Sequence, residues 1–186
     1  FYNGQLKAHS DVGSRTLEGL KPWVVVDTAG CGFEEVRSEE GGSVSNPDEA
    51  SFVLDRATEW LSLHPGMSLG IVAPYAAQVE TLRERWSELL RAQAAFRQAA
   101  VTIHTVDGFQ GQERDAMLVS LTRSNDRGEV GFLSESRRIH VAQTRAKMAC
   151  MLVGDSATLS TDAFLADLFE HAQAHGAYDS AWSWMV

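Results

Sequence analysis

Short apolar runs alternate with longer amphipathic segments along this chain, and this alternation restricts its fold more than any other feature. The apolar runs predict β-strands at 23–27, 68–73, 101–104, 116–121 and 148–153. Helical periodicity predicts helices at about 46–63, 76–99, 136–145 and 161–175. Strands that alternate with helices form a parallel sheet covered on both faces, with ligands bound beyond the carboxyl ends of its strands. We therefore expect an α/β fold of three layers, with a mainly parallel sheet and a ligand site at that edge.

The whole chain, 1–186, is expected to form one domain, because 186 residues suffice for a substantial hydrophobic core. It begins at Phe1 without an initiator Met, which indicates a fragment of a longer chain. Segment 34–45 is acidic and rich in Gly and Ser, which predicts a mobile loop. Segment 177–186 is an aromatic C-terminal extension that either docks on this domain or covers a neighbouring one.

The net charge and the cysteine content exclude several classes of protein. A formal net charge of −9 argues against a domain that binds nucleic acid through a basic surface overall, although it permits a local basic strip. Cys31 and Cys150 are too few for a disulfide framework or a four-ligand zinc site, so an intracellular protein, cytoplasmic or nuclear, is expected.

No acidic cluster has metal-site spacing, and His171 and His175 are expected to be exposed histidines rather than zinc ligands. No apolar run approaches the ~20 residues of a membrane span.

Nucleotide-binding motifs are missing from the places where this fold class usually has them. Neither the phosphate loop G-x-x-x-x-G-K-[ST] nor G-x-G-x-x-G occurs. The segment Val24–Gly30 looks like the Asp-x-x-Gly switch of small GTPases, but that interpretation fails without a phosphate loop. Asp27 is instead expected to end a strand and to cap the following turn.

The most informative block runs from Val101 to Gly154 and contains a polar, glycine-bearing loop between two predicted strands. Gly108 and Gly111 allow the backbone of this loop to approach a ligand closely. A later helix places Arg138 and Arg145 seven residues apart, and hence on one face. An Arg near the end of such a helix can act as an arginine finger toward a neighbouring domain.

This block resembles the last motifs of superfamily 1 helicases of the Upf1-like (nonsense-mediated-decay helicase) family. The pattern V-D-x-F-Q-G-x-E-x-D is matched by residues 106–115, S-x-x-R-x-N by 120–125, and R-R-x-N-V-A-x-T-R-A-K by 137–147. Residues 74–78 resemble P-Y-x-x-Q, and residues 1–6 resemble the segment that opens the second RecA-like domain. The resemblance is nearly chain-long and implies that second domain: a RecA-like, P-loop-NTPase-type sandwich that lacks the phosphate loop. His140 stands where the family usually has Asn, and an imidazole can replace only one of the two amide hydrogen bonds.

The resemblance also implies roles for individual residues. It makes Arg145 the catalytic residue, an arginine finger on the γ-phosphate of ATP. It implies a place in the ATP site for Gly111, Glu113, Gln110 and Arg138, with pairing to an acid inside the domain as the alternative for Arg138. It implies a nucleic-acid surface made of Thr105, Val106, Asp107, Tyr75 and Gln78, with core packing as the alternative for Tyr75.

Two functions from different classes follow. The family implies an ATP-dependent helicase that moves 5′ to 3′ along single-stranded RNA or DNA, with this chain as the C-terminal half of the motor. ATP would then bind at the interface with a first RecA-like domain that this sequence lacks and that holds most of the Mg²⁺ ligands, so the isolated chain is expected to be inactive. The alternative is a non-catalytic RecA-like platform for RNA or protein, for example on ribosomes or tRNA.

Overall fold

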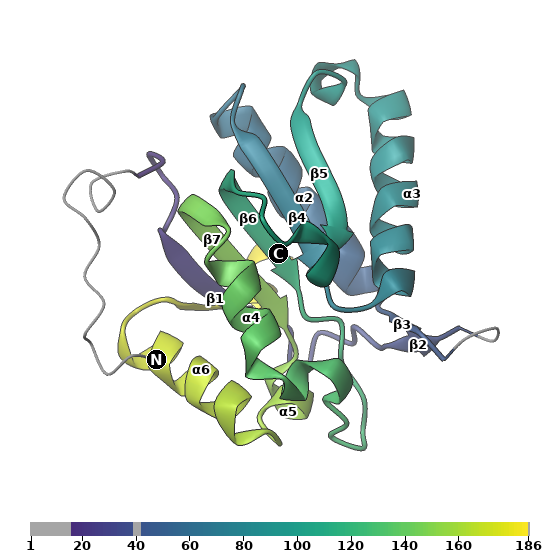
Figure 1. Cartoon of the computed structure of the whole chain (residues 1–186), viewed down its shortest axis with the longest axis vertical. Helices are drawn as coiled ribbons and strands as arrows, with labels where there is room; N and C mark the ends of the chain where they lie inside the picture. Colours follow the sequence, from purple (N-terminus) through teal and green to yellow (C-terminus); the bar gives the residue numbers. More distant parts are fainter. Residues whose placement is uncertain (1–15, 39–41, 186) are drawn as a thin grey trace.

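Six parallel strands form the central sheet of the computed structural model, which describes residues 16–38 and 42–185 (Figure 1). The strand order is β5-β4-β6-β7-β1-β8. The strands are β1 (Trp23–Asp27), β4 (Ser68–Ala73), β5 (Ala100–Thr105), β6 (Arg114–Ser120), β7 (Ala146–Gly154) and β8 (Tyr178–Ser180). All pairings within this sheet are parallel, which confirms the predicted α/β class. The resemblance to residues 1–6 of the family pattern lies outside the described residues.

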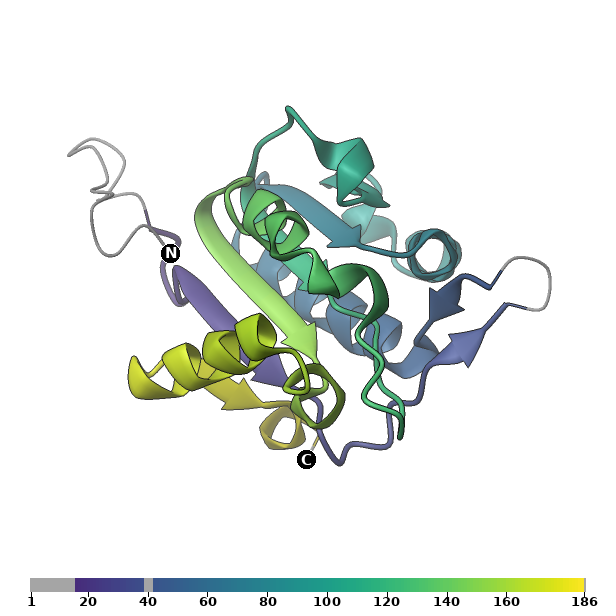
Figure 2. The ribbon, with the colours of Figure 1, turned by 60° about the horizontal axis from the view of Figure 1, so that its bottom comes forward.

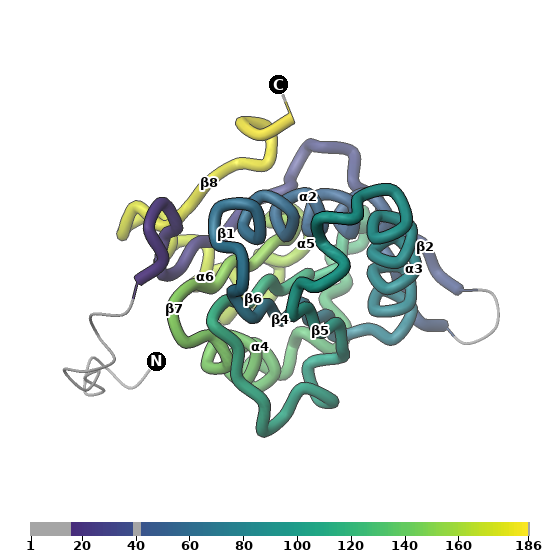
Figure 3. Tube along the Cα trace, turned by 90° about the horizontal axis from the view of Figure 1, so that it is seen from above, coloured from purple at the N-terminus to yellow at the C-terminus, as the bar shows by residue number. Residues whose placement is uncertain are grey.

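Helices cover both faces of this sheet and complete the three layers (Figure 3). The helices α2 (Pro47–Leu63) and α3 (Ala76–Ala92) pack on one face, and α4 (Ser136–Gln143), α5 (Ser156–Leu159) and α6 (Ala163–Ala174) pack on the other. Strand residues alternate between the two layers: Val24 and Val26 join the core under α2 and α3, whereas Val25 joins the core under α4 and α6. No helix within 16–38 and 42–185 is both long and apolar enough to cross a membrane.

The start of α2 lies where the sequence predicted it, whereas α3 and α4 both end earlier than predicted. Asn46 caps α2 as predicted, since its side-chain oxygen accepts the Glu49 N–H at 3.0 Å. Helix α3 is shorter than the predicted 76–99: it ends at Ala92, and Arg97 then folds back to donate to the carbonyl of Leu90. Helix α4 is also shorter than expected, because it ends at Gln143, two residues before Arg145.

The segment 34–45, predicted as a loop, is ordered at both ends. Short strands β2 (Val36–Arg37) and β3 (Val44–Ser45) pair antiparallel and project from the sheet as a hairpin (Figure 2). Glu35 anchors the base of this hairpin through an ion pair with Arg123, 88 residues away in sequence. Local composition carries no sign of such a distant partner, so the sequence did not predict the two short strands.

The aromatic C-terminal extension docks on this domain. Its strand β8 pairs with β1, and the ring of Trp184 stacks on Phe52 of α2 with centroids 5.8 Å apart. A short 3₁₀ turn, η4 (Ala181–Trp184), follows β8. The extension therefore adds an edge strand that the sequence analysis did not predict.

Glu49 is a carboxyl group that the fold buries completely. Its Oε1 accepts hydrogen bonds from the Ser120 hydroxyl at 2.5 Å and the Thr122 N–H at 2.8 Å, whereas Oε2 has no hydrogen-bond partner among the described residues. Burial raises the pKa of this carboxyl to about 8, because the ionised form loses its hydration and the two hydrogen bonds compensate only in part. Glu49 is therefore protonated at neutral pH.

The Glu49→Gln variant is expected to lose less stability than the wild type as the pH rises. The folded-state pKa of Glu49 lies above the unfolded value of 4.5, so its contribution is fully present below that value and is lost as the pH rises through about 8. Within this window the wild type should lose up to about 1.4 kcal/mol of unfolding free energy per pH unit relative to the variant. Urea denaturation across this pH range measures the difference, with Glu80→Gln on the exposed face of α3 as the matched control. Parallel pH profiles for wild type and Glu49→Gln would contradict the prediction.

Candidate functional site

A single loop joins the carboxyl edge of the sheet to its amino edge. Strand β5 ends at Thr105 and β6 begins at Arg114, and both pair in parallel with β4, so the intervening loop must run back along one face of the sheet. The loop contains a 3₁₀ turn, η2 (Asp107–Phe109), and no α-helix. Phe109 is buried and holds the loop to the sheet above Gly70, where a Cβ would lie 2.9 Å from the Phe109 ring. Polar groups of this one loop therefore reach both edges.

Arg145 and Glu113 lie side by side at the amino edge. The backbone N–H of Arg114 donates to the carbonyl of Arg145 at 3.0 Å, which links the starts of β6 and β7. Glu113 and Gly111 are exposed, and Gly111 has a φ of +83°, a conformation that favours glycine. The residues that the sequence assigned to an ATP site therefore lie at the amino edge, not at the carboxyl edge where the fold class suggested a ligand site. The reason is that Glu113 precedes β6 and Arg145 precedes β7.

The Arg145 side chain makes no ion pair with any acid in the described part of the chain. One terminal nitrogen donates to the Thr144 hydroxyl at 3.1 Å. Its Nε is buried and has no hydrogen-bond partner within residues 16–38 and 42–185. A guanidinium with unused donors is suited to bind an anion such as a phosphate.

Arg138 lies at the opposite end of α4 from Arg145. Its Nε is 3.4 Å from a carboxylate oxygen of Asp107, and a terminal nitrogen is 2.5 Å from Glu135. Arg138 lies in the first turn of α4, whereas Arg145 follows the C-terminal end of that helix. Arg138 thus pairs with acids inside the domain, the alternative that the sequence left open, and ties the loop to α4.

The remaining residues of the loop divide between exposed and buried positions. Asp107 and Gln110 are exposed and, with Arg138, line a cavity of about 260 Å³. Thr105 is half-buried, and its hydroxyl accepts the Gly108 N–H at 3.2 Å. Val106 is buried, and its N–H donates to the carbonyl of Ala73, so neither its side chain nor its N–H is available at the surface of this structure.

Tyr75 and Gln78 are structural residues. The Gln78 side chain is fully buried, with its oxygen accepting the Asn46 N–H and its nitrogen donating to the Asn46 carbonyl and the Ser120 hydroxyl. The Tyr75 hydroxyl is also buried and accepts hydrogen bonds from Arg123 and from the N–H of Phe132. The Gln78 side chain is therefore not available at the surface of this structure, and for Tyr75 the structure supports core packing. Long-range polar bonds, which local sequence does not reveal, hold both side chains inside.

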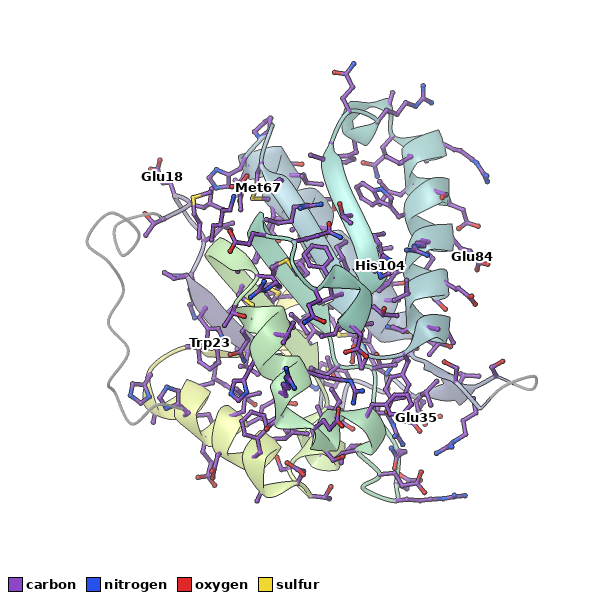
Figure 4. All side chains as sticks on the ribbon, viewed as in Figure 1. Glu18, Trp23, Glu35, Met67, Glu84 and His104 are labelled. Atoms are coloured by element: carbon purple, nitrogen blue, oxygen red, sulfur yellow. The ribbon has the colours of Figure 1, made fainter. Side chains whose placement is uncertain are left out.

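Sequence analysis missed the buried ion pair that joins these residues to the hairpin. The Arg123 and Glu35 side chains are only 4% and 6% exposed, and their closest N–O distance is 2.7 Å. Glu35, labelled in Figure 4, also accepts hydrogen bonds from the Ser124 N–H and the Asn125 side chain. The match of residues 120–125 to the family pattern was the available signal, since Arg123 is a fixed position of that motif.

His140, which replaces the usual Asn, lies on α4 with its ring 5.5 Å from that of Phe164. Partial burial lowers the pKa of its imidazole. The neutral ring therefore packs between α4 and α6 at neutral pH.

Comparisons with known proteins decide the family. A family model described as an AAA domain matches residues 1–157. DNA-binding protein SMUBP-2 of Mesocricetus auratus is 36% identical over 196 residues, covering 99% of this chain and 19% of the relative. Regulator of nonsense transcripts 1 of Dictyostelium discoideum is 31% identical, covering 91% of this chain and 13% of the relative. This chain belongs to the Upf1-like helicases.

Another Upf1-like relative agrees with this assignment, and a solved structure matches the fold. The probable helicase MAGATAMA 3 of Arabidopsis thaliana is 36% identical, covering 93% of this chain and 22% of the relative. SMUBP-2, which is similar to nearly the whole of this chain, is also called immunoglobulin mu-binding protein 2. The C-terminal domain of a possible DNA helicase from Lactobacillus plantarum matches the fold with a TM-score of 0.50 and 16% identity, covering 87% of this chain and 86% of that one. The chain spans about a fifth of the length of these two curated relatives.

Proposed function

We propose that this chain is the C-terminal motor domain of an ATP-dependent helicase that moves 5′ to 3′ along single-stranded RNA or DNA. The observation that carries this proposal is the position of Arg145, with unused guanidinium donors, beside Glu113 and Gly111 at one edge of the sheet. The names of the relatives, which include helicases and a DNA-binding protein, support the class of reaction.

ATP binds between this domain and a first RecA-like domain in the same protein. That domain supplies the phosphate loop, which this sequence lacks, and most of the ligands of Mg²⁺, since the described residues contain no group of His, Cys, Asp and Glu suited to a metal. Arg145 reaches the γ-phosphate and neutralises the charge that develops on the transferring phosphoryl group. Glu113 and the exposed backbone at Gly111 approach the nucleotide from the neighbouring strand.

The loop between β5 and β6 couples ATP to the nucleic-acid strand. Its first residues, Thr105 and Asp107, meet the strand at the carboxyl edge, and its last residues meet ATP at the amino edge. The ion pair between Asp107 and Arg138 ties the same loop to α4, the helix that leads to Arg145. Closure of the two domains on ATP therefore shifts the loop that grips the strand.

The expected result is nucleic-acid-stimulated ATP hydrolysis by the full-length protein and none by the 186-residue chain alone. The reason is that each domain supplies only part of the ATP site. Phosphate release, measured with and without single-stranded RNA or DNA, tests this, and unwinding of duplexes with a 5′ or a 3′ single-stranded tail tests the polarity. Robust hydrolysis by the isolated chain would refute the divided site. Strand binding without hydrolysis by the full-length protein would favour the non-catalytic platform.

A further inference from the structure

A polar cavity of about 640 Å³ opens at the carboxyl edge of the sheet, at the far end of the strands from Arg145. Thr28 follows β1, Asp155 follows β7, and Ser124 and Asn125 follow β6, and all four line the cavity. The loop from Gly30 to Glu35 closes one side. The proposed helicase function uses none of these residues.

Carboxylates dominate the charge of this cavity. Glu34, Asp126 and Asp155 line it, and none of them forms an ion pair within residues 16–38 and 42–185. Among the described lining residues the one cation is Arg127. Its guanidinium lies 3.6 Å from the carboxylate of Glu129, which is not buried. The local potential is therefore negative, which repels a nucleic-acid backbone and attracts a cation.

The negative potential also acts on a neighbouring thiol. Burial raises the pKa of Cys31, and the charges of Asp27 and Asp155 raise it further. Asp27 and Asp155 each end a strand, and each accepts hydrogen bonds from neutral N–H and hydroxyl groups. Because these donors carry no charge, they do not neutralise the negative charge of either carboxylate.

The buried hydroxyl of Thr28 is a second, independent feature of this cavity. Its side chain is 2% exposed, and its hydroxyl has no hydrogen-bond partner in the described structure. The other hydroxyls of the wall are paired: Ser124 and Thr158 both donate to Asp155. Because an unpaired buried hydroxyl costs stability, a ligand that supplies a partner for Thr28 binds with a free-energy gain.

An exposed aromatic ring borders the same loop. Trp182 is 53% exposed, and its indole nitrogen lies 3.7 Å from the position that a Cβ on Gly30 would occupy. Indole faces attract cations, and guanidinium groups stack on them.

We propose that this cavity binds an arginine side chain from a basic polypeptide segment, placing a protein-interaction site at the edge of the sheet opposite Arg145. The planar guanidinium donates to the carboxylates and to the Thr28 hydroxyl and stacks beside Trp182. A bare metal ion does not fit, because the described residues form no metal-binding cluster.

Isothermal titration calorimetry of the full-length protein with a tetra-arginine peptide tests the proposal. The tetra-citrulline peptide has the same shape without charge and is expected not to bind. The double variant Glu34→Gln with Asp126→Asn should weaken tetra-arginine binding roughly fivefold or more, because it removes two unpaired carboxylates. Its matched control is Glu80→Gln with Glu84→Gln, which removes the same net charge from the exposed face of α3. Equal weakening by the two double variants, or equal binding of the citrulline peptide, would overturn the proposal.

The isosteric Thr28→Val variant separates binding from folding. Without peptide it should raise the thermal midpoint, because a methyl group replaces an unpaired buried hydroxyl. The same variant should bind tetra-arginine more weakly than the wild type. A lower midpoint or unchanged peptide affinity would contradict the role assigned to the hydroxyl. ATP hydrolysis by Thr28→Val is expected to equal that of the wild type, so failure here is distinguishable from failure of the helicase proposal.

Discussion

The Arg145→Ala variant of the full-length protein is expected to hydrolyse ATP on the order of 10³-fold more slowly than the wild type in the presence of single-stranded nucleic acid. An arginine finger acts on charge that develops only in the transition state, so its loss lowers turnover far more than it lowers substrate affinity. Steady-state phosphate release measures the loss, and fluorescence anisotropy of a labelled oligonucleotide measures strand binding, which should persist.

Two further variants make this result specific to the finger. Arg145→Lys keeps the charge but lacks the planar fork of donors, so it should recover only part of the lost turnover. Arg91→Ala removes an exposed Arg from the last turn of α3 and should leave turnover unchanged. Similar turnover in wild type and Arg145→Ala would show that the finger is assigned to the wrong residue.

The Arg123→Ala variant is expected to lower the free energy of unfolding by about 3–5 kcal/mol. This change removes the buried guanidinium beside Glu35, leaves only the exposed Arg37 at 3.9 Å to pair with that carboxylate, and removes a hydrogen bond to the Tyr75 hydroxyl. Urea denaturation monitored by circular dichroism measures the loss. The hairpin of β2 and β3 should also detach, because Glu35 connects its base to the loop after β6.

The matched control is a surface pair, Lys21 with Asp179, whose side chains are 49% and 35% exposed. Lys21→Ala should cost at most about 1 kcal/mol, because solvent screens an exposed pair. If Arg123→Ala costs no more than Lys21→Ala, the buried pair does not stabilise the hairpin in the way described. Nearly full recovery of stability by a second change, Glu35→Leu in the Arg123→Ala background, would support the explanation, since it removes the carboxylate that lost its buried partner.

The sequence alone determined the parts of this protein that depend on neighbouring residues. Apolar runs located five of the six strands of the main sheet, and the pair Asn46-Pro47 located the start of α2, because strand burial and helix capping act within a few residues. The motif loop after β5 was recognisable for the same reason, since its residues are contiguous. The family assignment followed from these contiguous motifs and was confirmed.

Tertiary structure alone decided which distant groups meet. Gln78 bonds to Asn46 and Ser120, and Glu35 bonds to Arg123, across separations of 32 to 88 residues that no local pattern records. These contacts bury the side chains of Gln78, for which the sequence predicted a nucleic-acid contact, and of Glu35, which lies in the predicted mobile loop. The path of the chain likewise put Arg145 beside Glu113 and Arg138 beside Asp107, at opposite edges of the sheet. Helix periodicity predicted that the two arginines share a face, but α4 ends at Gln143, and only the packing of α4 along the strands shows that they lie near opposite edges of the sheet.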